Sequence, residues 1–121
     1  MNITCPTSGM NVLIAGPSPG GICVCGTGNV QDGSCVTPVQ VRVRVLAGSV
    51  SQLPPADPMQ PGDLDVPVVD QKWSAAGVSV PGSGGAPITV VAWEQAGTSG
   101  WGTPVSVWCN AGGSGATSCC G

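Results

Sequence analysis

The sequence contains no phenylalanine, tyrosine or histidine, and only 7% of its 121 residues are charged, against about 25% in typical domains. The absence of histidine removes the side chain that most often serves as a general base or as a metal ligand. Three basic residues are too few for the cationic surface that nucleic acid or an anionic membrane requires. We therefore expect a non-enzymatic protein with no cofactor, no nucleic-acid partner and no insertion into a membrane.

The sequence also lacks a long apolar run and any segment with a helical apolar period. The apolar stretch 10–15 is too short for a signal peptide, and no positively charged segment precedes it, so no signal peptide is visible in this chain. Three histories fit this pattern. A leader has been removed, the protein leaves the cell by lysis as virion components do, or its thiols stay reduced inside the cell.

Alternation of valine with polar residues is the clearest pattern that is present. In the segment 39–46 (Val-Gln-Val-Arg-Val-Arg-Val-Leu), valine takes every second position, and Arg42 and Arg44 share the opposite face. This period is that of a β-strand with one buried and one exposed face. The segment therefore predicts a strand that forms one wall of a valine-rich core.

Shorter apolar segments, separated by turns rich in glycine and proline, predict further strands. They are 11–15, 22–25, 66–73, 77–80, 87–94 and 103–109. About six to eight short strands at regular spacing are typical of a sandwich or barrel. We predict an all-β fold, a small β-sandwich or barrel of antiparallel strands, with cysteine-rich, disulfide-stapled N- and C-terminal segments.

The whole chain 1–121 is expected to form a single β domain. Residues 1–36 make a cysteine- and glycine-rich opening, residues 37–110 the β core, and residues 111–121 a tail of glycine, serine and cysteine. The core contains a proline-rich acidic loop at 49–66, where the proline density excludes a helix or a central strand. This loop is either an arm that lies on a neighbouring subunit or a connection on the surface.

Seven cysteines are present, and their position in glycine-rich turns favours disulfides. An odd number predicts three bridges and one remaining thiol, free or bonded to another chain. The alternative is reduced cysteine that packs as a small apolar residue. The disulfide candidates are Cys5, Cys23, Cys25, Cys35, Cys109, Cys119 and Cys120.

Metal binding has little support in the sequence. Cys23, Cys25 and Cys35 could supply thiolates to zinc, but the usual Cys-x2-Cys spacing is absent. The aspartates of the acidic loop do not have the spacing of a calcium loop. We therefore expect no metal site.

The arginines, the loop aspartates and the tryptophans are the candidates for an interface or a ligand site. Because Arg42 and Arg44 precede the acidic loop, we predict that their face is covered by this loop or by a neighbouring chain. Tryptophans that point outward would form an interface or a flat sugar-binding platform, whereas buried ones would fill the core. The candidates are Arg42, Arg44, Trp73, Trp93, Trp101, Trp108, Asp57, Asp63 and Asp65.

Two functional hypotheses follow. The first is a structural subunit of a larger assembly, such as a virion capsid-surface or decoration protein or a subunit of an extracellular fibre or coat. Its partners would be other protein subunits, identical or different. The second is a secreted module that binds carbohydrate through exposed tryptophan. Both predict an extracellular or virion location.

Overall fold

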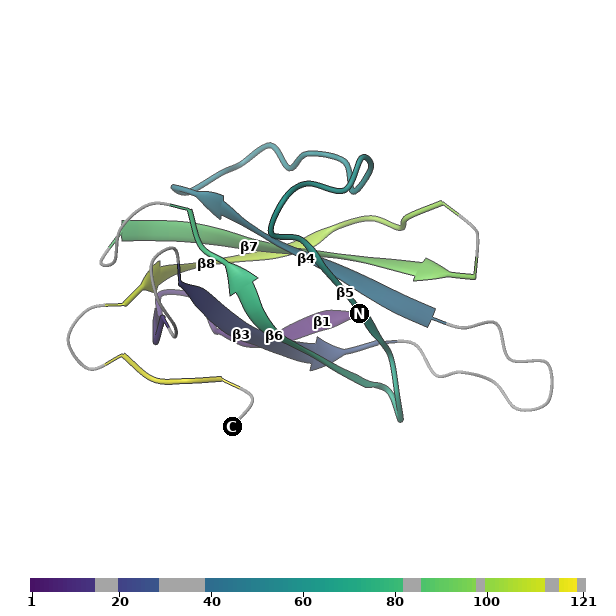
Figure 1. Cartoon of the computed structure of the whole chain (residues 1–121), viewed down its shortest axis with the longest axis horizontal. Helices are drawn as coiled ribbons and strands as arrows, with labels where there is room; N and C mark the ends of the chain where they lie inside the picture. Colours follow the sequence, from purple (N-terminus) through teal and green to yellow (C-terminus); the bar gives the residue numbers. More distant parts are fainter. Residues whose placement is uncertain (15–19, 29–38, 82–85, 98–99, 113–115, 120–121) are drawn as a thin grey trace.

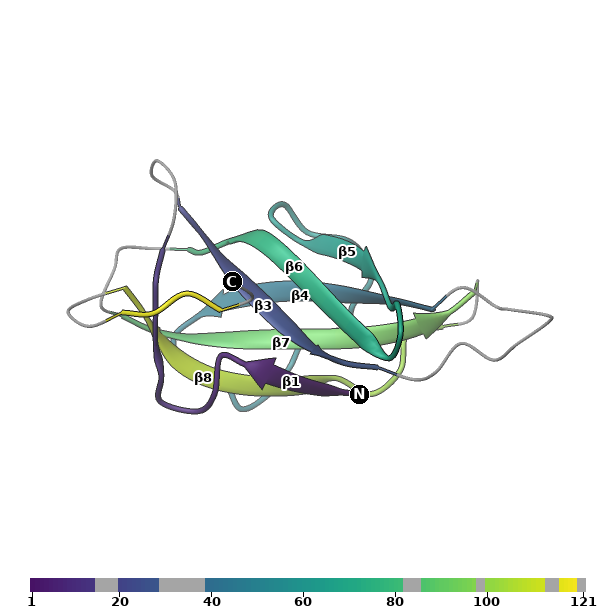
Figure 2. The same cartoon turned by 90° about the horizontal axis from the view of Figure 1, so that it is seen from below.

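The computed structural model describes residues 1–14, 20–28, 39–81, 86–97, 100–112 and 116–119. Eight strands, β1 to β8, form two sheets that pack face to face, so the all-β sandwich expected from the sequence is confirmed. The strands of one sheet cross those of the other obliquely, as the view from below shows (Figure 2).

The smaller sheet has three strands in the order β1-β3-β6, all antiparallel. Its strands are β1 (Asn2–Cys5), β3 (Gly21–Thr27) and β6 (Lys72–Ser79). In β3, Ile22 and Val24 point into the sandwich and are buried, whereas Cys23 and Cys25 lie on the outer face and are half-buried. Alternation along this short strand thus separates the core side chains from the thiols.

The larger sheet has five strands in the order β2-β8-β7-β4-β5. Its strands are β2 (Asn11–Val12), β8 (Val105–Ala111), β7 (Ala86–Ala96), β4 (Val39–Ala47) and β5 (Leu64–Pro67). Strand β2 runs parallel to β8, which differs from the expectation of antiparallel pairing throughout. The other neighbours in this sheet are antiparallel.

Valine fills the space between the sheets. The odd-numbered valines of β4 are all buried, and Val41 and Val43 are completely inaccessible. Each such side chain contributes about 1.5–3 kcal/mol by leaving water. Trp73 of β6 closes this core and donates its indole N–H to the carbonyl of Thr27, 3.1 Å away. The valine alternation at 39–46 therefore predicted both the strand and its buried face correctly.

The segments around 66–80 differ from the sequence expectation. A single strand at 66–73 was expected, but the chain turns at Asp70 and Gln71, which have φ values of 52° and 65°. Val69 and Lys72 exchange two backbone hydrogen bonds across this turn, so β5 and β6 form a tight connection between the sheets. Two adjacent residues with positive φ are typical of the tight two-residue turn that joins antiparallel strands. No glycine marks this turn in the sequence. Strand β1 was not predicted at all.

The proline-rich loop leaves β4 at its end and lies on the outer face of the five-stranded sheet, away from the smaller sheet (Figure 1). It spans 48–63, since β5 already begins at Leu64. At the opposite side of the molecule, a disulfide joins Cys5 to Cys119 across 114 residues. The loop and the disulfide are the two features that organise the candidate site residues.

Candidate functional site

Arg42 and Arg44 lie on the outer face of β4 and are nevertheless buried, with 7% and 6% of their surface exposed. The strand places them there because alternate side chains point to the same face. The loop 48–63 covers them, and β5 returns beside β4 with Asp65 directly opposite Arg42 in the ladder. The prediction that the loop or a neighbouring chain covers this face is confirmed, and the cover is the loop.

Arg42 binds two aspartates. Its Nε and Nη2 donate to the two carboxylate oxygens of Asp65 at 2.8 and 2.9 Å, and Nη1 donates to Asp57 at 3.1 Å. Nη1 also donates to the backbone carbonyl of Ala56 at 2.9 Å. The side chain of Asp57 is 74% exposed, so this contact forms the solvent side of the cluster.

Arg44 makes the more deeply buried pair. Its Nε and Nη2 donate to the two oxygens of Asp63, both at 2.8 Å, and the side chain of Asp63 is fully buried. The same guanidinium donates to the carbonyls of Pro55, Ala56 and Pro58 at 3.1–3.3 Å. Two parallel hydrogen bonds between a guanidinium and a carboxylate fix the relative orientation of the two side chains as well as their distance, because both groups are planar.

Two tryptophans complete the cluster. The guanidinium carbon of Arg42 lies 4.4 Å from the ring centre of Trp101, and that of Arg44 lies 4.8 Å from the ring centre of Trp93. Cations at these distances are attracted by the negative face of the ring. We call the set of Arg42, Arg44, Asp57, Asp63, Asp65, Trp93 and Trp101 the arginine clamp.

Hydrogen bonding also affects ionisation in the clamp. The bond to Asp65 raises the pKa of Arg42 above its ordinary value, and this outweighs the opposing effect of desolvation. Every guanidinium nitrogen of Arg42 and Arg44 donates to an oxygen of the loop or of β5. The arrangement is therefore suited to hold the loop on the sheet.

A second apolar cluster, which the sequence analysis missed, supports the loop from below. It consists of Ala56, Val91 and Trp93, with Leu46, Leu53 and Trp101 packed around them. Thr89 of β7 pins the start of the loop by donating to the Gly48 carbonyl and accepting from the Val50 amide. The sequence does carry a signal for this cluster. Large apolar side chains take outer positions of β4 and β7, and such a face requires a cover: Leu46, Val91 and Trp93.

The four tryptophans have different environments. Trp93 points away from the sandwich core, but the loop covers it and leaves 1% exposed. Trp73 is a core residue with 3% exposed, and Trp101 is half-buried over Arg42. Trp108, on the outer face of β8, is 44% exposed. A flat platform built from several of these rings is therefore absent from the described residues.

The cysteines correct the expectation of three disulfides. Cys5 is bonded to Cys119, with 5.7 Å between the α-carbons, whereas Cys23, Cys25 and Cys109 are free. Because three of the seven cysteines are free, the other four can form at most two disulfides. Cys35 and Cys120 lie outside the described residues.

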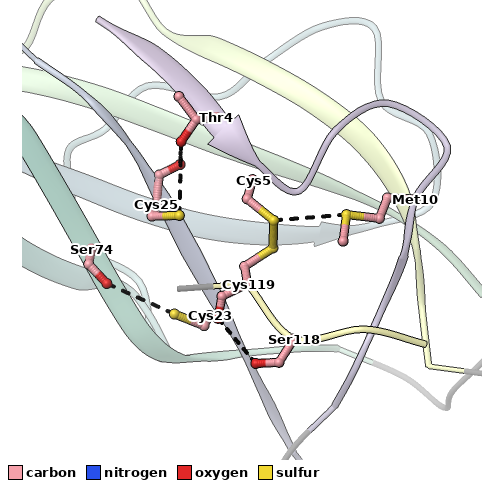
Figure 3. Close-up of a disulfide and its surroundings, with 8 residues drawn as sticks. All are labelled: Thr4, Cys5, Met10, Cys23, Cys25, Ser74, Ser118 and Cys119. Carbon is pink, nitrogen blue, oxygen red and sulfur yellow. Dashed lines mark hydrogen bonds between the residues drawn. A yellow bond between two sulfur atoms is a disulfide. The ribbon is translucent and has the colours of Figure 1, made fainter. Parts of the chain in front are cut away.

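The free cysteines follow from the strands that carry them. Cys109 points inward from β8 into the valine core, where burial raises the pKa of its thiol to about 11. Cys23 lies 3.9 Å from the hydroxyl of Ser74, and Cys25 lies 3.9 Å from that of Thr4 (Figure 3). Cys23, Cys25 and Cys109 are therefore present as thiols in the structure.

Within the described ranges, no group of three or more histidine, cysteine, aspartate or glutamate side chains is placed to hold a metal ion. Over the same ranges, no helix is long and apolar enough to cross a membrane.

Comparison with known proteins gives no family. No protein-family model matches the chain, and no curated protein matches it significantly. The geometry described above therefore carries the functional argument alone.

Proposed function

We propose that this protein is a non-enzymatic structural subunit of a larger assembly, such as a virion surface or an extracellular coat. The observation that carries the proposal is the distribution of charge. Of nine charged side chains, the arginine clamp holds five. Two of its aspartates each accept two hydrogen bonds from one arginine. Outside the clamp, the described residues have only Asp70, Lys72 and Glu94 as charged side chains.

A surface with so few charges favours association, because charge repulsion normally keeps small domains apart in solution. The exposed large apolar side chains of the described residues lie in three connecting segments and on β8: Leu13, Met59, Val69 and Trp108. Coverage by neighbouring subunits would remove these side chains from water. The disulfide between Cys5 and Cys119 supports an oxidising, extracellular or virion location.

The clamp also supports a structural role. It holds a long surface loop in one conformation, so the outer face of the five-stranded sheet is ordered before any partner arrives. A preformed surface loses less conformational entropy on binding than a mobile one. The covered arginines therefore contribute to a rigid building block.

Light scattering during size-exclusion chromatography tests this proposal. We expect a mass that is a multiple of the 11.8 kDa chain at high protein concentration. Trp108→Glu should lower that mass, whereas Ser51→Glu, which adds the same charge at an exposed loop position, should not. A wild-type monomer at every concentration, under reducing and non-reducing conditions, would overturn the proposal.

A carbohydrate-binding module is the second candidate, and Trp108 is the observation that favours it. Its exposed ring is on β8 between Ser106 and Asn110, whose polar side chains lie on the same face. An indole face with neighbouring hydrogen-bonding groups is suited to a sugar ring. Quenching or a blue shift of tryptophan fluorescence with a polysaccharide, lost in Trp108→Ala, would support this function over assembly.

A further inference from the structure

A bulge in β1 brings Cys5 opposite Cys25. The ladder pairs Ile3 with Gly26 and then Cys5 with Cys25, so Thr4 is the extra residue. Directly opposed residues of antiparallel strands have α-carbons about 4.5–5.5 Å apart, within the roughly 4.4–6.8 Å range that disulfides span. Cys5 therefore has two possible bonding partners, Cys119 and Cys25.

Cys25 is the partner that is free. Its side chain is half-buried on the outer face of the smaller sheet, and its sulfur contacts the Thr4 hydroxyl. It lines a surface groove of about 560 Å³, together with Thr27, Lys72 and Ser74. The close-up draws its thiol on β3 with the Cys5–Cys119 bond beside the same strand (Figure 3). The groove gives small thiols and disulfides access to Cys25.

We propose that Cys25 and the Cys5–Cys119 disulfide form a thiol–disulfide exchange site. The Cys25 thiolate attacks the sulfur of Cys5, the Cys5–Cys25 bond forms, and the Cys5–Cys119 bond breaks. Cys119 leaves as a thiolate and takes a proton from water, which balances the proton that Cys25 lost. The exchange uses no oxidant or reductant, because one disulfide and one thiol are present before and after it.

The exchange changes what holds the C-terminal segment 116–119. In the structure this segment is attached by the disulfide and by two backbone hydrogen bonds of Thr117, to Leu13 and Asn11. After exchange the cross-link to Cys5 is lost and the two hydrogen bonds of Thr117 remain. The buried thiol of Cys119 becomes available for a further disulfide. All three cysteines belong to one chain, so the site does not depend on the assembly proposed above.

Disulfide mapping tests the exchange in the Cys23→Ser variant, where Cys25 is the only cysteine between Met10 and Asp32. The protein is incubated with catalytic reduced glutathione at mildly alkaline pH and its thiols are then blocked with N-ethylmaleimide. Cleavage after methionine and before aspartate separates the three cysteines into the peptides 2–10, 11–31 and 70–121. We expect peptide 2–10 linked to 70–121 and, in a measurable second population, to 11–31.

Adding Cys25→Ser to that variant is the matched control. It should abolish the link between 2–10 and 11–31 and leave the link between 2–10 and 70–121. Absence of the link between 2–10 and 11–31 in the parent variant, after an incubation long enough for reduced glutathione to exchange with an accessible disulfide, would overturn the proposal.

A trapping variant gives an independent decision. Cys119→Ser, in the same Cys23→Ser background and with oxidised glutathione, should form the Cys5–Cys25 bond in most molecules, with native tryptophan fluorescence. Mixed disulfides of Cys5 and Cys25 with glutathione, and no bond between them, would contradict the proposed geometry. If this variant does not fold, the mapping of the Cys23→Ser variant still decides.

Discussion

Asp63 and Asp57 both bind an arginine, but only the carboxylate of Asp63 is fully buried. Arg44 neutralises its charge, and one of its oxygens also accepts a hydrogen bond from the backbone N–H of Gln60, 2.9 Å away. A buried ion pair adds little net stability compared with apolar packing, yet the loss of one partner leaves the other charge buried and unpaired. The two aspartates should therefore respond very differently to neutralisation.

We predict that Asp63→Asn lowers the free energy of unfolding by about 3–5 kcal/mol, because it leaves Arg44 buried without a counter-charge. Asp57→Asn, at a contact that is 74% exposed on the aspartate side, should cost under about 1 kcal/mol. Urea unfolding followed by tryptophan fluorescence measures both. Equal losses would show that burial does not set the strength of these pairs.

Cys109 predicts a dependence of stability on alkaline pH. Burial raises the pKa of its thiol from 9.0 to about 11, so the folded protein keeps the neutral form over a range where the unfolded chain has released the proton. This contribution to stability is fully present below pH 9 and is lost as the pH rises to about 11. The loss amounts to roughly 2–3 kcal/mol.

Unfolding free energies measured between neutral pH and pH 11 test this prediction. Cys109→Val removes the thiol and keeps an apolar side chain at an inward position, so its stability should fall less over the alkaline range. The same fall in both proteins would assign the effect to other groups.

At the scale of elements, the loop 48–63 is closed by glycines with positive φ at both ends. Gly48 and Gly62 have φ values of 77° and 91°, which residues other than glycine rarely adopt. A β-carbon added at Gly48 meets no atom within 4 Å, whereas one at Gly62 lies 2.8 Å from the β-carbon of Ser79. The two positions share the backbone requirement and differ in space.

We predict that Gly48→Ala costs about 1–2 kcal/mol from backbone strain alone. Gly62→Ala should cost at least roughly 1 kcal/mol more, since the loop must also shift away from β6. Thermal or urea unfolding of the pair gives the difference. Equal costs would mean that the loop moves freely against β6, contrary to the clamp.

Strands with regular alternation were predictable, and those without it were not. The valines of β4 gave the strand, its face and nearly its bounds. The turn at Asp70 and Gln71 was missed because its positive φ values occur at residues other than glycine. Strand β1 is short, bulged and polar at alternate positions, so it has little signal without its partner β3.

For the molecule as a whole, the disulfide is the main long-range constraint that the sequence could not place. Cys5 and Cys119 are 114 residues apart, and closing so long a loop restricts the unfolded chain strongly. The double variant Cys5→Ser/Cys119→Ser should lose about 2–5 kcal/mol of stability. Cys23→Ser, which removes a half-buried thiol, is the control and should be nearly neutral.

A reducing agent provides the complementary measurement. It should destabilise the wild-type protein by a similar amount and leave the double variant unchanged. An effect of reduction on the double variant would mean that another disulfide contributes to the fold.

The amino-acid sequence by itself determined the fold class, the valine wall of β4 and the covered face of Arg42 and Arg44. These follow from local periodicity and from the scarcity of other charges. Only the tertiary structure decided that Asp65 meets Arg42 across 23 residues, that the loop buries Trp93, and that Cys5 bonds to Cys119. The reason is physical: periodicity reports which face a side chain takes, whereas its partner depends on how distant strands come together.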